Sequence, residues 1–169
     1  MRGANDEDVA LCARSAAGDE QAFALLVAKH ERALRGFLAR LGTGNMADDI
    51  AQEAFIKAWR FAGQYDGKAR FSTWLTRIAW RCWLDRCRRR EPVPEAIGGD
   101  RVDSSERSEI DDMLMRLSPA ERAALVLCEG HGWTHAEAAA MLGLPLGTLK
   151  STVARAKERC RAMWRGDER

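Results

Sequence analysis

The spacing of the apolar residues is the feature that most constrains the fold. Apolar positions recur every three to four residues through most of the chain, which is the period of an amphipathic helix. Ala, Leu, Arg and Glu, which favour helices, are abundant, whereas β-branched residues are scarce. No segment shows the strict alternation of a half-buried strand. The sequence therefore predicts an all-α fold.

Breaks in this pattern separate the expected helices. Two helices are predicted between Asp8 and Leu41, and they are interrupted at Ala-Ala-Gly-Asp, where Asp19 can cap the second. Further helices are predicted over about Ala47–Phe61, Ser72–Arg89 and Gly147–Trp164. With 46% hydrophobic residues, the 169-residue chain can bury the core of one ordinary domain or of two small ones.

The stretch 91–112 has a different composition. It contains Pro, Gly and Ser, eight acidic residues and two basic ones, as expected of a flexible acidic linker. Two capping boxes follow it, Ser-Pro-Ala-Glu from Ser118 and Thr-His-Ala-Glu from Thr134, and each marks the start of a helix. We therefore expect two small helical domains, residues 1–90 and 113–169, joined by the linker 91–112.

The segment 70–90 combines aromatic rings with positive charge. It holds three of the six tryptophans and seven arginines, but only one acid, Asp85. At about 100° per residue, Phe71 and Leu75 fall on one face and Trp80 and Trp83 on the opposite one. A quarter turn from the first face lie Arg70, Arg77, Arg81 and Arg88. Two interpretations are open: buried rings beside a solvated arginine face, or a surface for unpaired DNA on which rings stack and guanidinium groups contact phosphates.

The stretch 134–160 has the spacing of a helix-turn-helix. Ala139 is small where two helices cross, Gly143 lies at the turn, and Leu149 is expected to be buried. A helical hairpin packed only for stability would share these three positions. The last helix, however, is rich in donors that suit a major groove, namely Lys150, Ser151, Thr152, Arg155, Lys157, Arg159 and Arg161.

Catalytic chemistry is not indicated. The chain shows no Ser/His/Asp arrangement, Gly-rich phosphate loop or paired carboxylates, so no catalytic residue is expected. Cys128, His131 and His135 are possible zinc ligands, but the intervening glycines break the helix that would bring them together, so we expect neither metal nor cofactor. Unpaired cysteines, and the lack of a targeting or membrane-spanning segment, favour a reducing cytoplasm.

Three segments together resemble the extracytoplasmic-function (group IV) bacterial sigma factors of the sigma-70 family. Residues 48–60, 71–90 and 117–159 are similar to regions 2.2, 2.3 to 2.4, and 4, in the family's order and spacing. The resemblance implies region 2 over residues 1–90 and region 4 over residues 113–169. It also implies an alternative sigma factor that binds core RNA polymerase, recognises the −35 and −10 promoter elements and opens the −10 region.

The resemblance also implies three sets of binding residues. The polymerase-binding residues, which would contact the β′ clamp helices, are Asp49, Gln52, Glu53, Phe55 and Trp59. The −10 residues are Tyr65, Lys68, Arg70, Trp74, Arg77, Trp80, Arg81 and Arg88. The −35 residues are Thr148, Lys150, Ser151, Thr152, Arg155 and Arg159. Further expected partners are the β flap of polymerase and an anti-sigma factor; a small-molecule substrate and direct membrane insertion are not expected.

Two positions depart from the family pattern. Arg81 stands where many relatives have Asn, so the family's base preference at −10 is not transferred. Ala154 stands where bulkier residues are frequent, so no −35 contact is assigned to it. Two other functions stay open: a sigma mimic that binds only an anti-sigma factor, and a plain helix-turn-helix repressor. The linker either threads the RNA exit channel or serves as a solvated tether.

Overall fold

The computed structural model describes residues 3–89, 109–130 and 133–166, which form helices and turns and contain no strand. The predicted all-α fold is confirmed. The described residues form two compact units: residues 3–38 and 45–89 in the first, and 39–44, 109–130 and 133–166 in the second.

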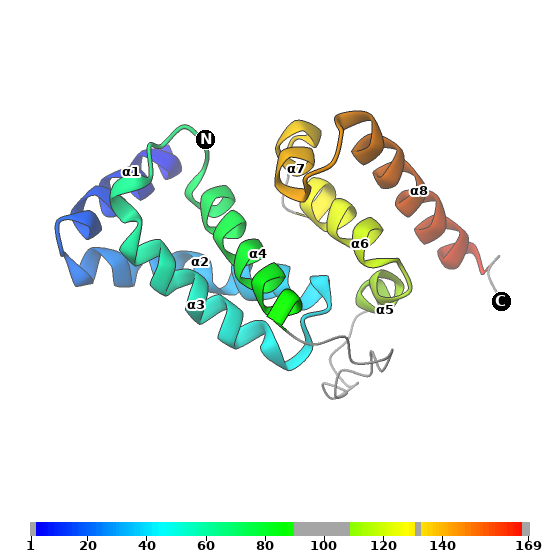
Figure 1. The fold of residues 1–169 in the computed structure, drawn as a ribbon, viewed down its shortest axis with the longest axis horizontal. Coiled ribbons are helices and arrows are strands. Elements are labelled where there is room, and N and C mark those ends of the chain that lie inside the picture. The colour runs from blue at the N-terminus through cyan, green and yellow to red at the C-terminus, as the bar shows by residue number, and fades with distance from the viewer. Residues whose placement is uncertain (1–2, 90–108, 131–132, 167–169) are drawn as a thin grey trace. The chain divides into compact units, whose positions relative to one another are not determined.

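The first unit contains four α-helices and two short 3₁₀ turns (Figure 1). Its elements are α1 (Gly3–Ala16), α2 (Glu20–Leu41), η1 (Gly44–Met46), α3 (Ala47–Arg60), η2 (Ala62–Gln64) and α4 (Phe71–Arg89). Residues 39–41 at the end of α2 and Gly44 of η1 group with the second unit. These bounds lie close to the predicted ones, except that α1 begins five residues before Asp8.

The turn between α1 and α2 is closed as predicted. The Asp19 carboxylate accepts a hydrogen bond from the Ala22 backbone N–H at 3.0 Å, which satisfies one of the free donors at the start of α2. Arg14 donates two further bonds to the same carboxylate, at 2.9 and 2.7 Å. The Ala22 bond, followed by the Arg14 bonds, lowers the pKa of Asp19.

Helix α4 is buried over more of its circumference than the sequence suggested. Phe71, Leu75 and Cys82 lie in the core beside α3, as expected from their shared face. Trp80, on the opposite side of the helix, is only 7% exposed, and its ring centroid lies 4.8 Å from that of the half-buried Trp83. The side of α4 opposite Phe71 is therefore partly covered as well.

The second unit contains α5 (Glu109–Met115), α6 (Pro119–Leu125), the π-helical turn η3 (Val126–Gly130), α7 (His135–Leu142) and α8 (Leu146–Arg165). Both predicted capping boxes are present: the Ser118 and Thr134 hydroxyls accept from the backbone N–H three residues on, and the Glu side chain there accepts from the cap N–H. Helix α5 begins at Glu109, so the linker boundary predicted at residue 112 falls inside it. The rest of that linker, residues 91–108, lies outside the described residues.

The turn of the helix-turn-helix depends on Gly143. This residue ends α7 with φ +67°, in the left-handed region that glycine adopts without a Cβ clash. Ala139 and Leu149 are buried, as their positions in the motif predicted, because α7 and α8 pack against each other there.

Candidate nucleic-acid and partner-binding surfaces

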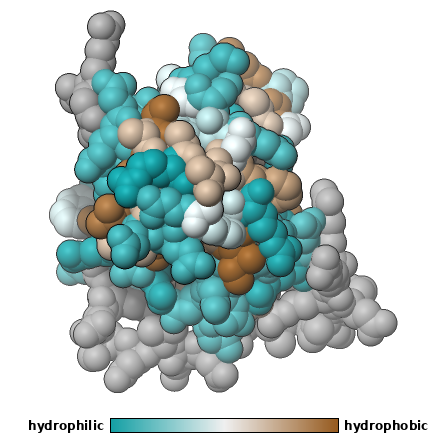
Figure 2. All heavy atoms as spheres, turned by 90° about the vertical axis from the view of Figure 1, so that its left-hand side faces the viewer, coloured by the Kyte–Doolittle hydropathy of each residue, from teal (hydrophilic) through white to brown (hydrophobic). Residues whose placement is uncertain are grey.

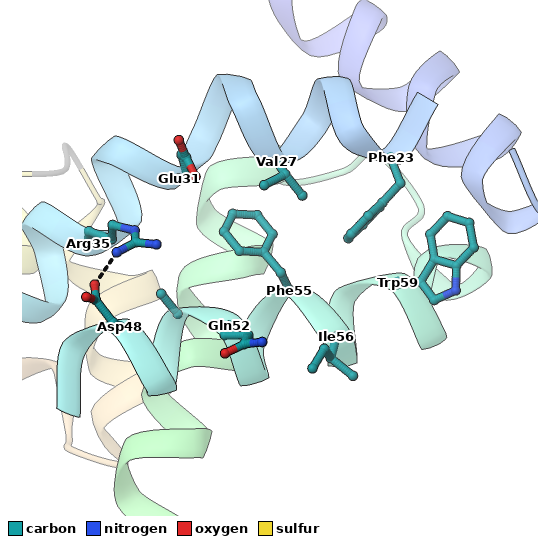
Figure 3. Close-up of a pocket in the computed structure, with 10 residues that line it drawn as sticks. Phe23, Val27, Glu31, Arg35, Asp48, Gln52, Phe55, Ile56 and Trp59 are labelled. Carbon is teal, nitrogen blue, oxygen red and sulfur yellow. Dashed lines mark hydrogen bonds and ion pairs between the residues drawn. The ribbon is translucent and has the colours of Figure 1, made fainter. Parts of the chain in front are cut away.

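An apolar groove of about 400 Å³ lies between α2 and α3 (Figure 3). It is lined by Phe23, Val27, Glu31, Arg35, Asp48, Ala51, Gln52, Phe55, Ile56 and Trp59. The Phe23 and Trp59 rings meet edge to face with centroids 5.0 Å apart, while an ion pair between Arg35 and Asp48 stands at one end. Ile56 is 46% exposed, so part of this apolar lining faces solvent.

The five residues predicted to bind polymerase divide into two groups. Gln52, Phe55 and Trp59 line the groove. Asp49 and Glu53 do not: both pair with Arg86 of α4, at 3.4 and 3.2 Å.

Glu53 is held by bases from two helices. It accepts from Lys57 at 2.9 Å, and this bond, together with that from Arg86, lowers its pKa. Through their ion pairs with Arg86, Asp49 and Glu53 therefore link α3 to α4. Arg86 was missing from the predicted site because its partners lie 33 and 37 residues earlier in the chain.

The loop before α4 and the first turn of α4 bring three aromatic rings together. The Tyr65 ring lies 5.5 Å from Phe71 and 5.4 Å from Trp74, centroid to centroid. The Tyr65 hydroxyl donates to the Ala69 carbonyl at 2.8 Å, and burial raises the pKa of Tyr65 to about 12, so the phenol stays neutral.

Arginine side chains accompany this cluster along α4. Arg70 and Arg81 are exposed and Arg77 is half-buried, and with Trp74 they lie within about 60° of each other around the helix. Lys68 is exposed in the loop and pairs with Asp66 at 2.9 Å. The structure does not present Trp80 at this surface, and the Arg88 side chain lies outside the described residues.

The residues predicted to contact the −35 element also divide. Thr148, Lys150, Ser151 and Arg155 are exposed on the first turns of α8. Thr152 is buried, and its hydroxyl donates to the Thr148 carbonyl at 2.8 Å, because this side of α8 packs into the second unit.

Arg159 takes part in a contact within the second unit. Its guanidinium donates to Glu121 of α6 at 2.8 Å and to the Arg116 carbonyl at 3.3 Å. Thr152 and Arg159 are thus placed in the packing of α8 rather than on its free face. Sequence spacing alone did not separate these two residues from the exposed donors.

A second groove lies where α5 meets the end of α8. Here Glu109, Asp112, Met113, Arg116, Met163 and Trp164 line a groove of about 260 Å³. Trp164 is 69% exposed, which is unusual for a large ring on a small helical unit. The sequence pattern indicated no role for these residues.

In the first unit, apolar side chains form separate patches within a mainly hydrophilic face (Figure 2).

The described residues offer neither a cluster of metal ligands nor a membrane-spanning helix. No three His, Cys, Asp or Glu side chains of residues 3–89, 109–130 and 133–166 gather closely enough to hold a metal ion; His131, one of the candidate ligands, lies outside these ranges. Within the same ranges, no helix combines the length and apolar character needed to span a membrane.

Comparison with known proteins places both units in one family. The family model for sigma-70 region 2 matches residues 26–92, and that for sigma-70 region 4 matches residues 107–160. The chain is 39% identical to the extracytoplasmic-function (ECF) RNA polymerase sigma factor SigM of Mycobacterium tuberculosis, over 90% of this chain and 82% of that protein. It is 32% identical to the ECF RNA polymerase sigma-E factor of Haemophilus influenzae, over 89% and 92% of the two chains.

Two solved structures are similar to this chain over most of its length. CnrH in complex with the cytosolic domain of CnrY is 28% identical with a TM-score of 0.70, covering 96% of this chain and 99% of that one. The sigma factor RpoE in complex with the anti-sigma factor NepR, from Bartonella quintana, is 25% identical with a TM-score of 0.69, covering 86% and 98%. With both regions matched and relatives aligned over most of their length, this chain belongs to the ECF sigma factors of RNA polymerase, within the sigma-70 family.

Proposed function

We propose that this chain binds core RNA polymerase, recognises the −35 and −10 promoter elements and opens the −10 region. One observation carries the proposal: in a chain of this family, each unit exposes its own set of donors, on α4 and on the first turns of α8. The chain itself needs no catalytic residue, because RNA synthesis takes place on the polymerase. Its place of action is the cytoplasm.

The groove between α2 and α3 is the proposed docking site for the β′ clamp helices. A helical partner can insert apolar side chains beside Phe55 and Trp59, while the Gln52 amide offers a donor and an acceptor at the rim. Asp49 and Glu53 contribute by holding α4 in place, so that the docking helix and the DNA-binding helix move as one body.

The loop and α4 are proposed to hold the unpaired −10 strand. Arg70, Arg77 and Arg81 would contact successive phosphates, and the Tyr65 and Trp74 rings offer faces on which bases can stack, at about 1 to 3 kcal/mol each. Lys68 adds positive charge at the tip of the loop. Trp80, which is buried, would act by supporting Trp83.

Helix α8 is proposed to enter the major groove of the −35 element. Thr148, Lys150, Ser151 and Arg155 face outward at its amino-terminal end, where a recognition helix contacts base edges and phosphates. Thr152 and Arg159 would position this helix through their contacts within the second unit.

Two protein partners complete the proposal. The groove between α5 and α8, which combines the exposed Trp164 ring with charged side chains, is proposed to bind the β flap of polymerase. An anti-sigma factor would cover one or more of these surfaces when transcription is not required, as the solved complexes of similar proteins suggest.

Formation of heparin-resistant open complexes with core polymerase tests the proposal. A sigma mimic would bind an anti-sigma factor but leave the promoter unopened, and a repressor would bind duplex DNA without polymerase. Arg81→Ala should reduce open complexes about tenfold, since a charge-assisted hydrogen bond contributes about 1.5 kcal/mol or more. Arg32→Ala, which changes another exposed arginine, on α2, should leave the number of open complexes unchanged.

A further inference from the structure

Helix α1 contacts the loop that precedes α4, although α1 itself lies before the stretch matched by the region 2 model, which covers residues 26–92. The Asn5 amide donates to the Gly67 carbonyl at 3.3 Å. The Asn5 carbonyl oxygen lies 3.2 Å from the Tyr65 hydroxyl, which also reaches Ala69 at 2.8 Å. One side chain near the start of α1 therefore contacts the loop at two points.

An apolar contact lies one helical turn further along α1. Gly67 has φ +71°, and a Cβ built on it would come within 2.9 Å of Val9 Cγ2. The backbone of the loop thus passes so close to Val9 that only glycine fits, both for its conformation and for the space available.

The next residues of α1 are anchored in the body of the first unit. Asp8 is buried and pairs with Lys29 at 2.8 Å and with His30 at 3.1 Å, both on α2. The Cys12 thiol donates to the Ala62 carbonyl at 3.5 Å, just before the loop. Contacts on α2 and at the entrance to the loop therefore hold α1 in place, and Asn5 and Val9 extend from this anchored helix.

Bonds within the loop have a different effect. Tyr65 donates to Ala69, and the Lys68 backbone N–H donates to Asp66 at 3.1 Å, so these contacts join residues of the loop to each other. They define the shape of the loop, whereas the contacts from Asn5 and Val9 define where that shape lies relative to α4.

We propose that α1 is a positioning element for promoter opening, in which Asn5 and Val9 hold the loop 65–70 where Tyr65, Lys68 and Arg70 meet the unpaired −10 strand. The inference rests on the proposed function. Asn5 and Val9 are positioning residues, since they act on DNA through the loop.

Asn5→Ala is the direct test, with two measurements on the full chain. Hydrogen exchange of the free protein should show faster exchange of the backbone amides of residues 65–70, because local opening becomes easier. Holoenzyme carrying the variant should bind a fork-junction −10 probe about fivefold more weakly, which corresponds to about 1 kcal/mol. Its affinity for core polymerase and for a −35 duplex should stay the same.

Arg14→Ala is the matched control. It removes polar contacts at the opposite end of α1, to Asp19, and leaves the loop contacts in place. Measuring both its thermal stability and its fork binding shows what a weaker α1 does to fork binding when the loop contacts are intact. The exchange of residues 65–70 should match that of the wild type.

A double-mutant cycle tests the contact between Val9 and Gly67. Gly67→Ala should weaken fork binding because its Cβ meets Val9, and Val9→Ala in the same chain should restore part of the loss by making room. Independent effects of the two changes would contradict a contact that positions the loop.

The possible failures can be told apart. If wild-type holoenzyme does not open promoters, the proposed function fails, and the role of α1 in opening fails with it. If the wild type opens promoters and Asn5→Ala either leaves loop exchange unchanged or speeds it without weakening fork binding, the positioning role of α1 is overturned while the proposed function stands.

Discussion

Arg159 illustrates how a single residue can join several parts of the second unit. Its guanidinium binds the Glu121 carboxylate, and the same carboxylate accepts from the Ser118 backbone N–H at 3.1 Å and the Ser118 hydroxyl at 2.7 Å. The Ser118 bond, with the Arg159 charge, lowers the pKa of Glu121. The carboxy-terminal half of α8 is therefore linked to the capping box that starts α6.

Replacing Arg159 should destabilise the second unit. Arg159→Ala should lower the free energy of unfolding by about 1 kcal/mol, a modest value because the Arg159 side chain is 42% exposed. Urea unfolding followed by circular dichroism measures this change. Arg161→Ala, which removes a pair in which both side chains are 63% exposed, should unfold like wild type. Equal stability of the Arg159 and Arg161 variants would argue against a packing role for Arg159.

His30 makes stability depend on pH near neutrality. Burial lowers its pKa below the ordinary 6.5, outweighing the attraction of the neighbouring Asp8 carboxylate. In the unfolded chain the imidazole takes up a proton at a higher pH than in the folded chain. The contribution of neutral His30 to the free energy of unfolding is therefore fully present above pH 6.5. It decreases as the pH falls from 6.5 toward the lowered pKa of the folded state.

Thermal unfolding between about pH 5.5 and 7.5 tests the role of His30. The melting temperature of the wild type should decrease on the acid side of pH 6.5, whereas that of His30→Gln should vary less. The carboxylates of Asp19, Glu53 and Glu121 have lowered pKa values and titrate below this window. A variant with the same pH profile as the wild type would show that another group is responsible.

At the scale of elements, two glycines near one turn have opposite requirements. Gly143 ends α7 with a positive φ, and a Cβ built on it would meet no atom within 4 Å. Gly147 lies in the first turn of α8, also in open space, but with no positive φ. Any difference between the two on substitution therefore comes from the backbone and not from packing.

Alanine at the two glycines should shift stability in opposite directions. Gly143→Ala should destabilise the chain by about 1 kcal/mol, because the left-handed conformation is strained for a residue with a Cβ. Gly147→Ala should stabilise it by a few tenths of a kcal/mol, because alanine loses less entropy in a helix. Denaturant unfolding of both variants gives the comparison, and a shared sign would contradict this account of the turn.

At the scale of the whole molecule, charge is distributed unevenly. The formal net charge is only +2, yet the exposed donors of α4 and α8 gather on two surfaces, while many of the acids are engaged in internal pairs such as Asp49 and Glu53 with Arg86. A nearly neutral chain can therefore bind a polyanion through local surfaces.

Promoter binding by the holoenzyme should consequently be sensitive to salt. If about six phosphates are neutralised, affinity should fall about a thousandfold between 50 and 200 mM salt. Lys150→Ala and Arg155→Ala should each reduce the slope of log affinity against log salt by about one. Glu158→Gln, an exposed position on the same helix, is a control that removes no donor. A slope unchanged by both substitutions would rule out phosphate contacts at these positions.

Local features of the fold were predictable from the sequence. The helical period places α3, α4 and α8 within one residue of their observed bounds, and the caps at Asp19, Ser118 and Thr134 form as expected. These features involve residues at most a few positions apart, so composition and spacing contain the information needed. The family signatures likewise identified both regions, because their residues are continuous in the chain.

Tertiary structure decided which side chains of each helix are free. Arg155 and Arg159 both look like DNA-binding donors in the sequence, yet Arg155 is exposed and Arg159 binds Glu121. Trp74 and Trp80 are likewise both tryptophans of α4, yet Trp74 lies beside the arginines and Trp80 is buried. A helix presents every side to its surroundings, and only the elements packed against it determine which sides are covered. Those contacts join residues tens of positions apart, as Asn5 meets Gly67, and no local pattern in the sequence encodes them.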